Sequence, residues 1–409
     1  MRKKIIKTMS LIAVFILLFT LCACGNTSGS DTTADTENSE NSRPPLNVGV
    51  LTMLNLSEEE TSDLVTAHIM ANRTLRRDYI ESTRGEDATR PTRAEGEERP
   101  TNADGTPVRR GPEINVTFFD TLDSMLMALN AGDISTMSVY LSTANYLCAT
   151  NDNLVINNYS ADKIVDNEYS RLVTNGILSN DFSFLMLESN SALRDEFNTA
   201  IQGMKEDGTL QTLISEQIDA YKNGNEIKAV ALPQIAGAET VKVAVTGSLP
   251  PMDYVAADGS PAGFNTAVLA EISNRIGKNI EIVVVDSIGR AAALSSGTVD
   301  VVFWTRTSEV ANNATPITDA EIEELKQSGN TTMNEREINT LNRISSLIDF
   351  NNYGKLDMPE GTIVTDSYFS DRIVSVTTKE NKEKQDAERE SRRAERESER
   401  AAQQTETSN

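Results

Sequence analysis

Strand and helix patterns alternate in both halves of this 409-residue chain, and the linker between the halves has no apolar period. Apolar runs in the second half predict strands at 241–246, 280–285 and 299–304, with helices at 264–277 and 287–296. The first half has the same order, with strands predicted at 46–54, 114–120 and 135–141. Such alternation is typical of α/β folds built on mostly parallel sheets.

The N-terminus has the pattern of a targeting segment. Four basic residues among the first seven precede the apolar run "LIAVFILLFTL". The following "LCACG" resembles a bacterial lipobox, which implies cleavage before Cys24 and thioether lipidation of that thiol, with palmitate as the expected acyl chain. We therefore predict a signal peptide at 1–23 and a flexible tether at 24–45, placing the protein on the extracellular face of the cell membrane. A plain membrane anchor and a secretory signal with incidental cysteines stay open.

Composition excludes several classes of function. The formal net charge of -23 argues against nucleic acid as a partner, because that affinity depends on basic residues. His68 is the only histidine, and Cys148 is the only cysteine beyond the leader and Cys24. A zinc site or a nucleophile–histidine site lacks residues, so we expect no metal, no cofactor and no enzyme activity. The helical pattern around His68 predicts a surface or boundary position.

The residues at 241–304 resemble the first lobe of the family 3 extracellular solute-binding proteins, the amino-acid-type receptors of ABC importers. The resemblance rests on "VKVAV", "SLPPMDY", "ADGSPAGFN" and "ALSSGTVDVVFW". Residues 46–222 are similar to the second lobe and C-terminal helices of that family, through "TLDSMLMALNAGDISTMSVYLSTANYL" and "FSFLMLESNSALRDEFNTAIQGMKEDGT". "TDSYFSDRIVSVTT" looks like the strand that leads from the first lobe to the second. The resemblance implies a type II periplasmic-binding-protein-like α/β fold with two lobes joined by two hinge strands.

These pieces occur once each, in rotated order, which predicts a circular permutation of one two-lobed receptor. Two truncated halves of tandem receptors are the alternative. Permutation predicts that "FSFLML" and "RIVSVTT" lie side by side and that Leu46 lies near Lys379. The first half is predicted to hold lobe two at 46–181, with a disordered insertion at 80–112, and then the return crossover and C-terminal helices at 182–225. A linker at 226–239 leads to lobe one at 240–378, which has a helical insertion at 307–360. A charged tail follows at 379–409 and is either a solvated helix or disordered.

The resemblance also implies a ligand cleft between the lobes. An amino-acid ligand needs a cation or amides for its carboxylate and an anion for its ammonium group. Arg306 is interpreted as a carboxylate clamp or a surface arginine, and Asp253 as an ammonium partner or an exposed carboxylate. Trp304 is a stacking face or a core residue. The predicted ligand-binding residues are Met252, Asp253, Tyr254, Asn265, Trp304, Thr305, Arg306, Thr52 and Tyr140.

The leading functional hypothesis is a lipid-anchored, monomeric solute-binding protein that delivers a small polar ligand, an amino acid or a related amine or carboxylate, to an ABC permease. Tyr140 stands where the family has the aspartate that meets the ammonium group, so another small polar ligand stays open. The alternative is a sensory or interaction lipoprotein on the same fold with a degenerate cleft.

Overall fold

The structure is a computed structural model that describes residues 45–51, 58–82, 113–157, 167–225, 227–286, 289–307, 333–347 and 359–406. The predicted signal peptide, Cys24, Thr52 and most of both insertions lie outside these ranges. No helix within the described ranges combines the length and the apolar character needed to cross a membrane.

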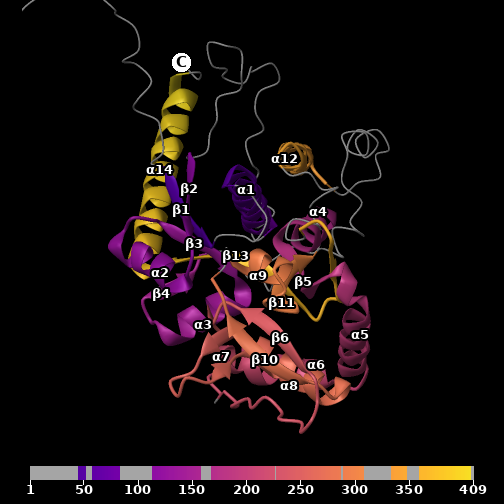
Figure 1. The fold of residues 1–409 in the computed structure, drawn as a ribbon. Helices are drawn as coiled ribbons and strands as arrows, with labels where there is room; N and C mark the ends of the chain where they lie inside the picture. Colours follow the sequence, from indigo (N-terminus) through magenta and orange to yellow (C-terminus); the bar gives the residue numbers. More distant parts are fainter. Residues whose placement is uncertain are drawn as a thin grey trace, which may run out of the picture. The chain divides into compact units, whose positions relative to one another are not determined.

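Three parallel strands and one antiparallel strand form the sheet of lobe one (Figure 1). In spatial order they are β10 (Asn279–Val284), β6 (Thr240–Val245), β11 (Val301–Thr307) and β5 (Ser179–Leu187). β6 pairs parallel with both β10 and β11, and β11 pairs antiparallel with β5. The antiparallel strand is therefore the one that comes from the first half of the chain.

The sheet of lobe two has the same construction. Its spatial order is β2 (Ile114–Phe119), β1 (Leu46–Leu51), β3 (Thr136–Tyr140) and β13 (Phe369–Thr378). β1 pairs parallel with β2 and β3, and β3 pairs antiparallel with β13. Here the antiparallel strand comes from the second half of the chain.

β5 and β13 pair with each other where the two sheets meet. Phe369 lies opposite Phe182, and Arg372 lies opposite Ser179, in antiparallel register. The two hinge strands are therefore neighbours, but they pair only over residues 179–182 and 369–372. The segments "FSFLML" and "RIVSVTT" were predicted to lie side by side; instead they continue beyond this pairing into different lobes, where "FSFLML" pairs with β11 and "RIVSVTT" with β3. Two short strands extend the crossovers: β12 (Thr362–Val364) pairs with β5, and β4 (Leu154–Ile156) pairs with β13. Two α/β lobes joined by two hinge strands are the fold class that we predicted.

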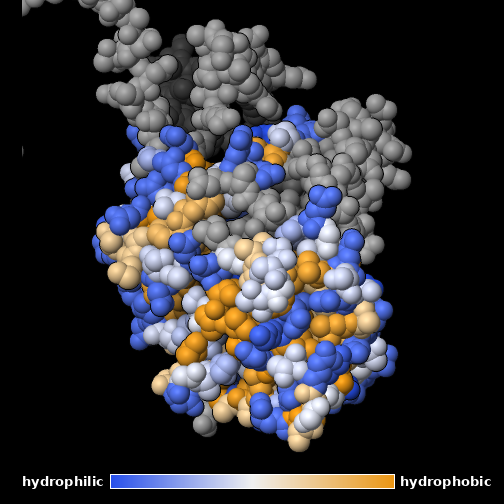
Figure 2. Space-filling view, viewed as in Figure 1, coloured by the Kyte–Doolittle hydropathy of each residue, from blue (hydrophilic) through white to orange (hydrophobic). Residues whose placement is uncertain are grey.

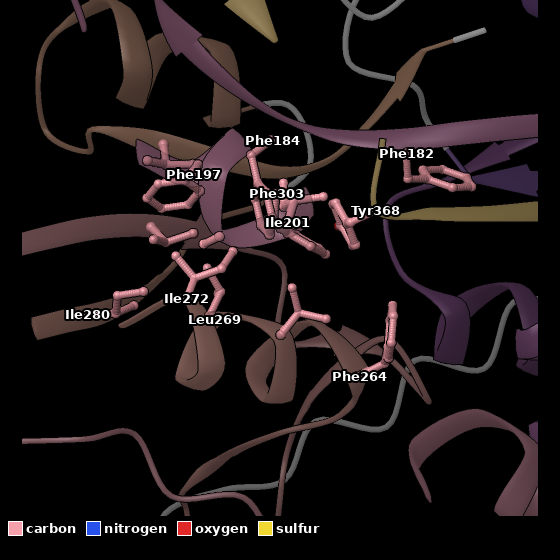
Figure 3. Close-up of a cluster of buried hydrophobic side chains, with 14 of the residues drawn as sticks. Phe182, Phe184, Phe197, Ile201, Phe264, Leu269, Ile272, Ile280, Phe303 and Tyr368 are labelled. Atoms are coloured by element: carbon pink, nitrogen blue, oxygen red, sulfur yellow. The ribbon is translucent and has the colours of Figure 1, made fainter. Parts of the chain in front are cut away.

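Helices cover both faces of the lobe-one sheet because its strands are apolar on both sides. Phe182, Phe184 and Met186 of β5 face the cluster beneath α5 (Ser191–Glu206), α6 (Thr209–Ile214) and α8 (Phe264–Ile276). Leu185 faces the other cluster, under α9 (Gly289–Ser295). Figure 3 shows the first cluster, with Phe184, Phe197, Ile201 and Phe303 close together. Two helices follow the return crossover, as predicted for the segment at 182–225: α5 ends at Glu206, and α6 begins at Thr209.

Lobe two has helices α1 (Glu58–Ser82), α2 (Leu122–Ala131) and α3 (Leu141–Thr150). The Thr121 side chain accepts a hydrogen bond from the Ser124 amide at the start of α2, and Gly132 ends the helix in the left-handed conformation. Met125 and Leu129 of α2 pack with Met137 of β3, while Val65 of α1 packs with Val48 and Val50 of β1.

The second face of α1 is covered by α12 (Glu335–Ser345) and α4 (Glu168–Val173). α12 follows lobe one in sequence, yet its buried residues Ile338, Leu341 and Ile344 pack with Leu64, Ala67, Ala71 and Leu75 of α1. α12 lies within the segment predicted as a helical insertion at 307–360, and a capping box formed by Asn334 and Glu337 starts the helix.

Three local predictions need correction. α1 continues to Ser82, so residues 80–82 belong to a helix and not to the insertion predicted at 80–112. His68 is buried, with 2% of its surface exposed, because it lies on the face of α1 that packs inward and not at the surface. Residues 379–406 form the helix α14 (Lys379–Glu406), which decides between the two alternatives for the tail.

Phe184 tests the packing of the lobe-one core. Its ring stacks on Tyr368 with centroids 4.4 Å apart and meets the edge of Phe197 at 5.5 Å. Phe184→Ala should lower the free energy of unfolding by about 3–5 kcal/mol, because the substitution leaves a cavity between two packed rings. Met127→Ala is the control: this side chain is 72% exposed, and its loss should change stability by less than about 0.5 kcal/mol. Equal denaturant midpoints for the two variants would contradict this assignment of the core.

Candidate functional site

The turn after β6 lies at the carboxyl end of the first strand of lobe one, the edge at which open α/β sheets bind ligands. Asp253 holds this turn from inside the lobe. Its Oδ2 accepts hydrogen bonds from the Gly247 amide and, at 3.0 Å, from the Thr246 hydroxyl. Asp253 lies on β8 (Asp253–Val255), which pairs with β7 (Ser248–Leu249), so the turn and its acid belong to one small sheet.

Burial controls the charge of Asp253. The residue is 1% exposed, and among the described residues no hydrogen bond reaches its Oδ1. Desolvation raises the pKa of this carboxyl to about 7, against the opposing effect of the bonds from Gly247 and Thr246 and of the Arg290 charge. The carboxyl group is therefore engaged inside lobe one and does not reach solvent.

Met252 and Asn265 lie behind the same turn. Both are fully buried, and the Asn265 amide donates to the Met252 carbonyl. Asn265 Oδ1 accepts a 2.8 Å hydrogen bond from the hydroxyl of Tyr368, the residue before β13, which ties the first turn of α8 to the start of that strand. Gly263 precedes α8 at φ 103°, and a Cβ there would lie 2.7 Å from the carbonyl oxygens of Pro251 and Met252. Only glycine fits this close approach.

The lobe-two side of the site is built on the hinge strands. The Tyr140 hydroxyl donates a hydrogen bond to Asn180 Oδ1 at 2.9 Å, and the Tyr140 ring meets the Phe182 ring edge-on, with centroids 4.9 Å apart.

Asp371, on the hinge strand β13, binds the start of α3. Its Oδ2 accepts hydrogen bonds from the Ser142 amide at 3.0 Å and from the Ser142 hydroxyl at 2.5 Å. Asp371 thus caps the first turn of α3 from a neighbouring strand, and burial raises its pKa to about 6 against those bonds and the Arg372 charge.

Register places the end of β11 at the same point. Arg306 lies opposite Phe182 on β5, and Thr305 lies opposite Ser183. Phe369 lies opposite Phe182 on the other side of β5, and its ring packs 5.1 Å from Phe264 at the start of α8. The backbones of Tyr140, Thr305, Arg306 and Asn265 are therefore gathered around one crossing of the hinge strands. The side chains of Trp304, Thr305 and Arg306 lie outside the description.

Other predicted residues have a different placement. Met252 and Asp253 lie inside lobe one, and Tyr254 turns its hydroxyl toward Tyr221, 3.4 Å away. Sequence reasoning missed Asp371, Ser142 and Asn180. An acidic residue within the strand pattern "YFSDRIVSV" was the available signal, because an acid inside a buried strand needs a partner.

Two exposed hydrophobic side chains lie near this turn. Val255 and Val284 are exposed, and both lie beside Gly247, since a Cβ there would lie 3.3 Å from Val284 and 3.5 Å from Val255. Figure 2 shows hydrophobic residues interspersed with hydrophilic ones on the visible face of the region that holds β6 and β10. A separate open hollow of about 430 Å³ is lined by Lys205, Ile214, Ser367, Tyr368, Phe369 and Ser370. None of the predicted ligand-binding residues lines that hollow.

Comparison with known proteins bears on lobe one. Residues 241–346 match the model for bacterial extracellular solute-binding proteins, family 3. The match covers 106 of the 409 residues, from β6 to α12, and confirms the resemblance found in the sequence of lobe one. No curated protein gives a significant match to this sequence.

Solved structures give distant likenesses. The ligand-binding component of an ABC-type import system from Staphylococcus aureus is 8% identical, with 84% of this chain and 69% of that chain covered and a TM-score of 0.34. A putative L-cystine ABC transporter protein from Listeria monocytogenes is 11% identical, with 82% and 84% covered and a TM-score of 0.30. The aliphatic sulphonate binding protein SsuA from Escherichia coli is 12% identical, with 79% and 82% covered and a TM-score of 0.26. The fold assignment rests instead on the strand order and hinge pairing described above.

Asp253→Asn tests the buried acid of the lobe-one turn. An acid whose pKa is 3.8 in the unfolded chain and about 7 in the folded chain stabilises the fold below pH 4, and this stabilisation is lost as the pH rises to 7. Asparagine keeps an acceptor for Gly247 and does not ionise. Between pH 4 and pH 8 the wild type should therefore lose about 4 kcal/mol of unfolding free energy relative to the variant.

The control for this titration is Asp258→Asn. Asp258 is exposed, and its pKa is lowered by hydrogen bonds from Ser260, so its linkage lies below pH 4. The difference between this variant and the wild type should stay constant from pH 5 to pH 8. A constant difference for Asp253→Asn as well would show that Asp253 is not a buried acid in solution.

Proposed function

We propose that the chain is a lipid-anchored extracellular solute-binding protein that captures a small polar ligand, an amino acid or a related amine or carboxylate, for an ABC importer. The family match at 241–346 carries the proposal, because the matched segment includes β6, β8, α8 and β11, on or next to which most of the predicted ligand-binding residues lie. Two lobes joined by paired strands can close on a ligand about that hinge.

The candidate binding groups support a polar ligand. Arg306 lies in register with Phe182 at the hinge, where a guanidinium group would suit a carboxylate. Tyr140 presents a half-buried ring and hydroxyl from lobe two. Thr52 follows β1, at the corresponding edge of lobe two, and Cys24 supplies the anchor through the tether; both lie outside the described residues.

We also propose that the chain order is a circular permutation of one receptor. The start of β1 and the end of β13 lie on either side of β3: the Ser135 amide donates to the Asn47 carbonyl, and the Thr377 hydroxyl donates to the Ser135 carbonyl. A chain could therefore continue from the end of β13 to the start of β1 through a short connection.

A thermal-shift screen over amino acids, small amines and small carboxylates tests the binding function. A ligand that binds only the folded state raises the melting temperature in a concentration-dependent way. The same ligand should shift Tyr140→Phe less, because that variant lacks the hydroxyl that fixes Asn180 at the hinge.

Tyr169→Phe is the matched control for the screen. Tyr169 is fully buried in the cluster of α1, α4 and α12, away from the hinge crossing, so the ligand should shift this variant as it shifts the wild type. No shift with any ligand of these three classes would contradict the proposal.

A second candidate is a sensory or interaction lipoprotein with a degenerate cleft. The observation in its favour is that Met252, Asp253 and Asn265 are buried within lobe one, while Tyr254 contacts Tyr221. The two functions differ in their partner. Co-purification of an ABC permease with the membrane-anchored chain favours transport, whereas capture of another protein with an empty screen favours this second candidate.

A further inference from the structure

Three tyrosines from three separate elements meet where lobe one faces lobe two. Tyr254 is on β8 of lobe one, Tyr221 is on α7 (Ala220–Asn223), and Tyr146 is on α3 of lobe two. The hydroxyls of Tyr221 and Tyr254 are 3.4 Å apart, and the rings of Tyr221 and Tyr146 meet edge-on with centroids 4.9 Å apart. We name these three residues the tyrosine junction.

The hydroxyl of Tyr146 faces the same point. Its pKa is raised first by burial and then by the nearby Tyr254 hydroxyl and the Asp123 carboxylate of α2. The pKa of Tyr221 is likewise raised, by burial and then by its contact with Tyr254. The junction therefore brings together side chains from both lobes, through α2 and α3 on one side and β8 on the other.

Tyr221 is held with lobe one by the helices before it. Leu210 of α6 and Ile218 of the π-helical turn η4 (Ser215–Asp219) are buried in the lobe-one core. A π turn adds a residue to the helix and rotates the next helical residues by about 100° relative to an unbroken α-helix. Buried side chains before and within η4 thus anchor the segment in lobe one, and the turn sets the direction in which Tyr221 points.

We propose that the tyrosine junction is a latch between the lobes, whose contacts must separate each time the cleft opens. The proposal rests on the proposed function, since it concerns the closing of that same cleft. Tyr146 moves with lobe two, whereas Tyr221 and Tyr254 move with lobe one, so rotation about β5 and β13 parts the Tyr146–Tyr221 pair. The latch thereby sets the balance between open and closed forms, and with it the apparent affinity for a solute.

The residue type suits a contact that forms and breaks. All three tyrosines are half-buried, with an apolar ring and a polar hydroxyl. A tyrosine that leaves such a contact regains water at its hydroxyl, so exposure on opening is less costly than for a phenylalanine. An edge-to-face aromatic pair contributes energy that is small enough to be reversed by a ligand.

Two measurements on the full chain without added solute test the latch. Ruthenium-sensitised oxidation with persulfate should join Tyr221 to Tyr254 or Tyr146 as dityrosine, identified by mass spectrometry of the linked peptides, while Tyr169 stays unlinked. Tyr221→Ala should not form the dityrosine that involves position 221, and its radius of gyration by small-angle X-ray scattering should be larger than that of the wild type. The variant should keep a cooperative unfolding transition, which shows that it folds.

Tyr146→Ala removes the same pair from the lobe-two side and covers the case in which Tyr221→Ala fails to fold. Its radius of gyration should increase as well. If the wild type gives the linked peptides but the folded variants keep the wild-type radius of gyration, the latch is overturned and the three rings are merely close together. Absence of junction peptides would overturn the geometry itself. Neither readout needs a ligand, so a failed ligand screen and a failed latch are distinguishable.

Discussion

The antiparallel pairing of β5 with β13 holds the two lobes together. Each strand crosses from one half of the chain into the sheet of the other lobe: β5 pairs with β11, and β13 pairs with β3. The lobe-one sheet therefore ends on a strand from the first half of the chain, and the lobe-two sheet ends on a strand from the second half. Removing either strand would expose an unpaired sheet edge and half of an apolar core.

The candidate site depends on this crossing. Tyr140 contacts Phe182, Asp371 caps α3, and Tyr368 binds Asn265 at the start of α8. Each contact joins a lobe to a hinge strand, so a change in the relative position of the lobes acts on all of them. The buried acid Asp253 binds the turn after β6, and the buried acid Asp371 binds the start of α3.

Much of the fold followed from apolar periodicity. The β-branched apolar runs at 241–246 and 299–304 predicted β6 and β11, because burial leaves an apolar pattern in the sequence. Polar segments left no such pattern. The last residues of α1, at 80–82, are followed by a polar, charged stretch and were therefore predicted as the start of the insertion. The π turn η2 (Thr174–Leu178) lies in a stretch without an apolar pattern.

The site was harder to predict because its contacts join residues far apart in the chain. Asp371 is hydrogen-bonded to Ser142, 229 positions away in the sequence, and Asn265 is hydrogen-bonded to Tyr368, 103 positions away. The loop "SLPPMDY" was expected to present Met252 to a ligand, but an apolar residue in a loop can equally face inward, as Met252 does here. The partner of Tyr254 is Tyr221, which precedes it by 33 positions in a segment read only as a helix.

Fragment complementation tests most directly whether one two-lobed receptor is shared between the two halves of the chain. Gly237 is exposed in the linker, with open space around it, so the chain can be divided after it into residues 24–237 and 238–409. Neither fragment should unfold cooperatively alone, because each lacks a hinge strand of its own lobe, and an equimolar mixture should recover one cooperative transition. Two fragments that each unfold cooperatively, with a mixture that is only their sum, would contradict the account and indicate two independent halves.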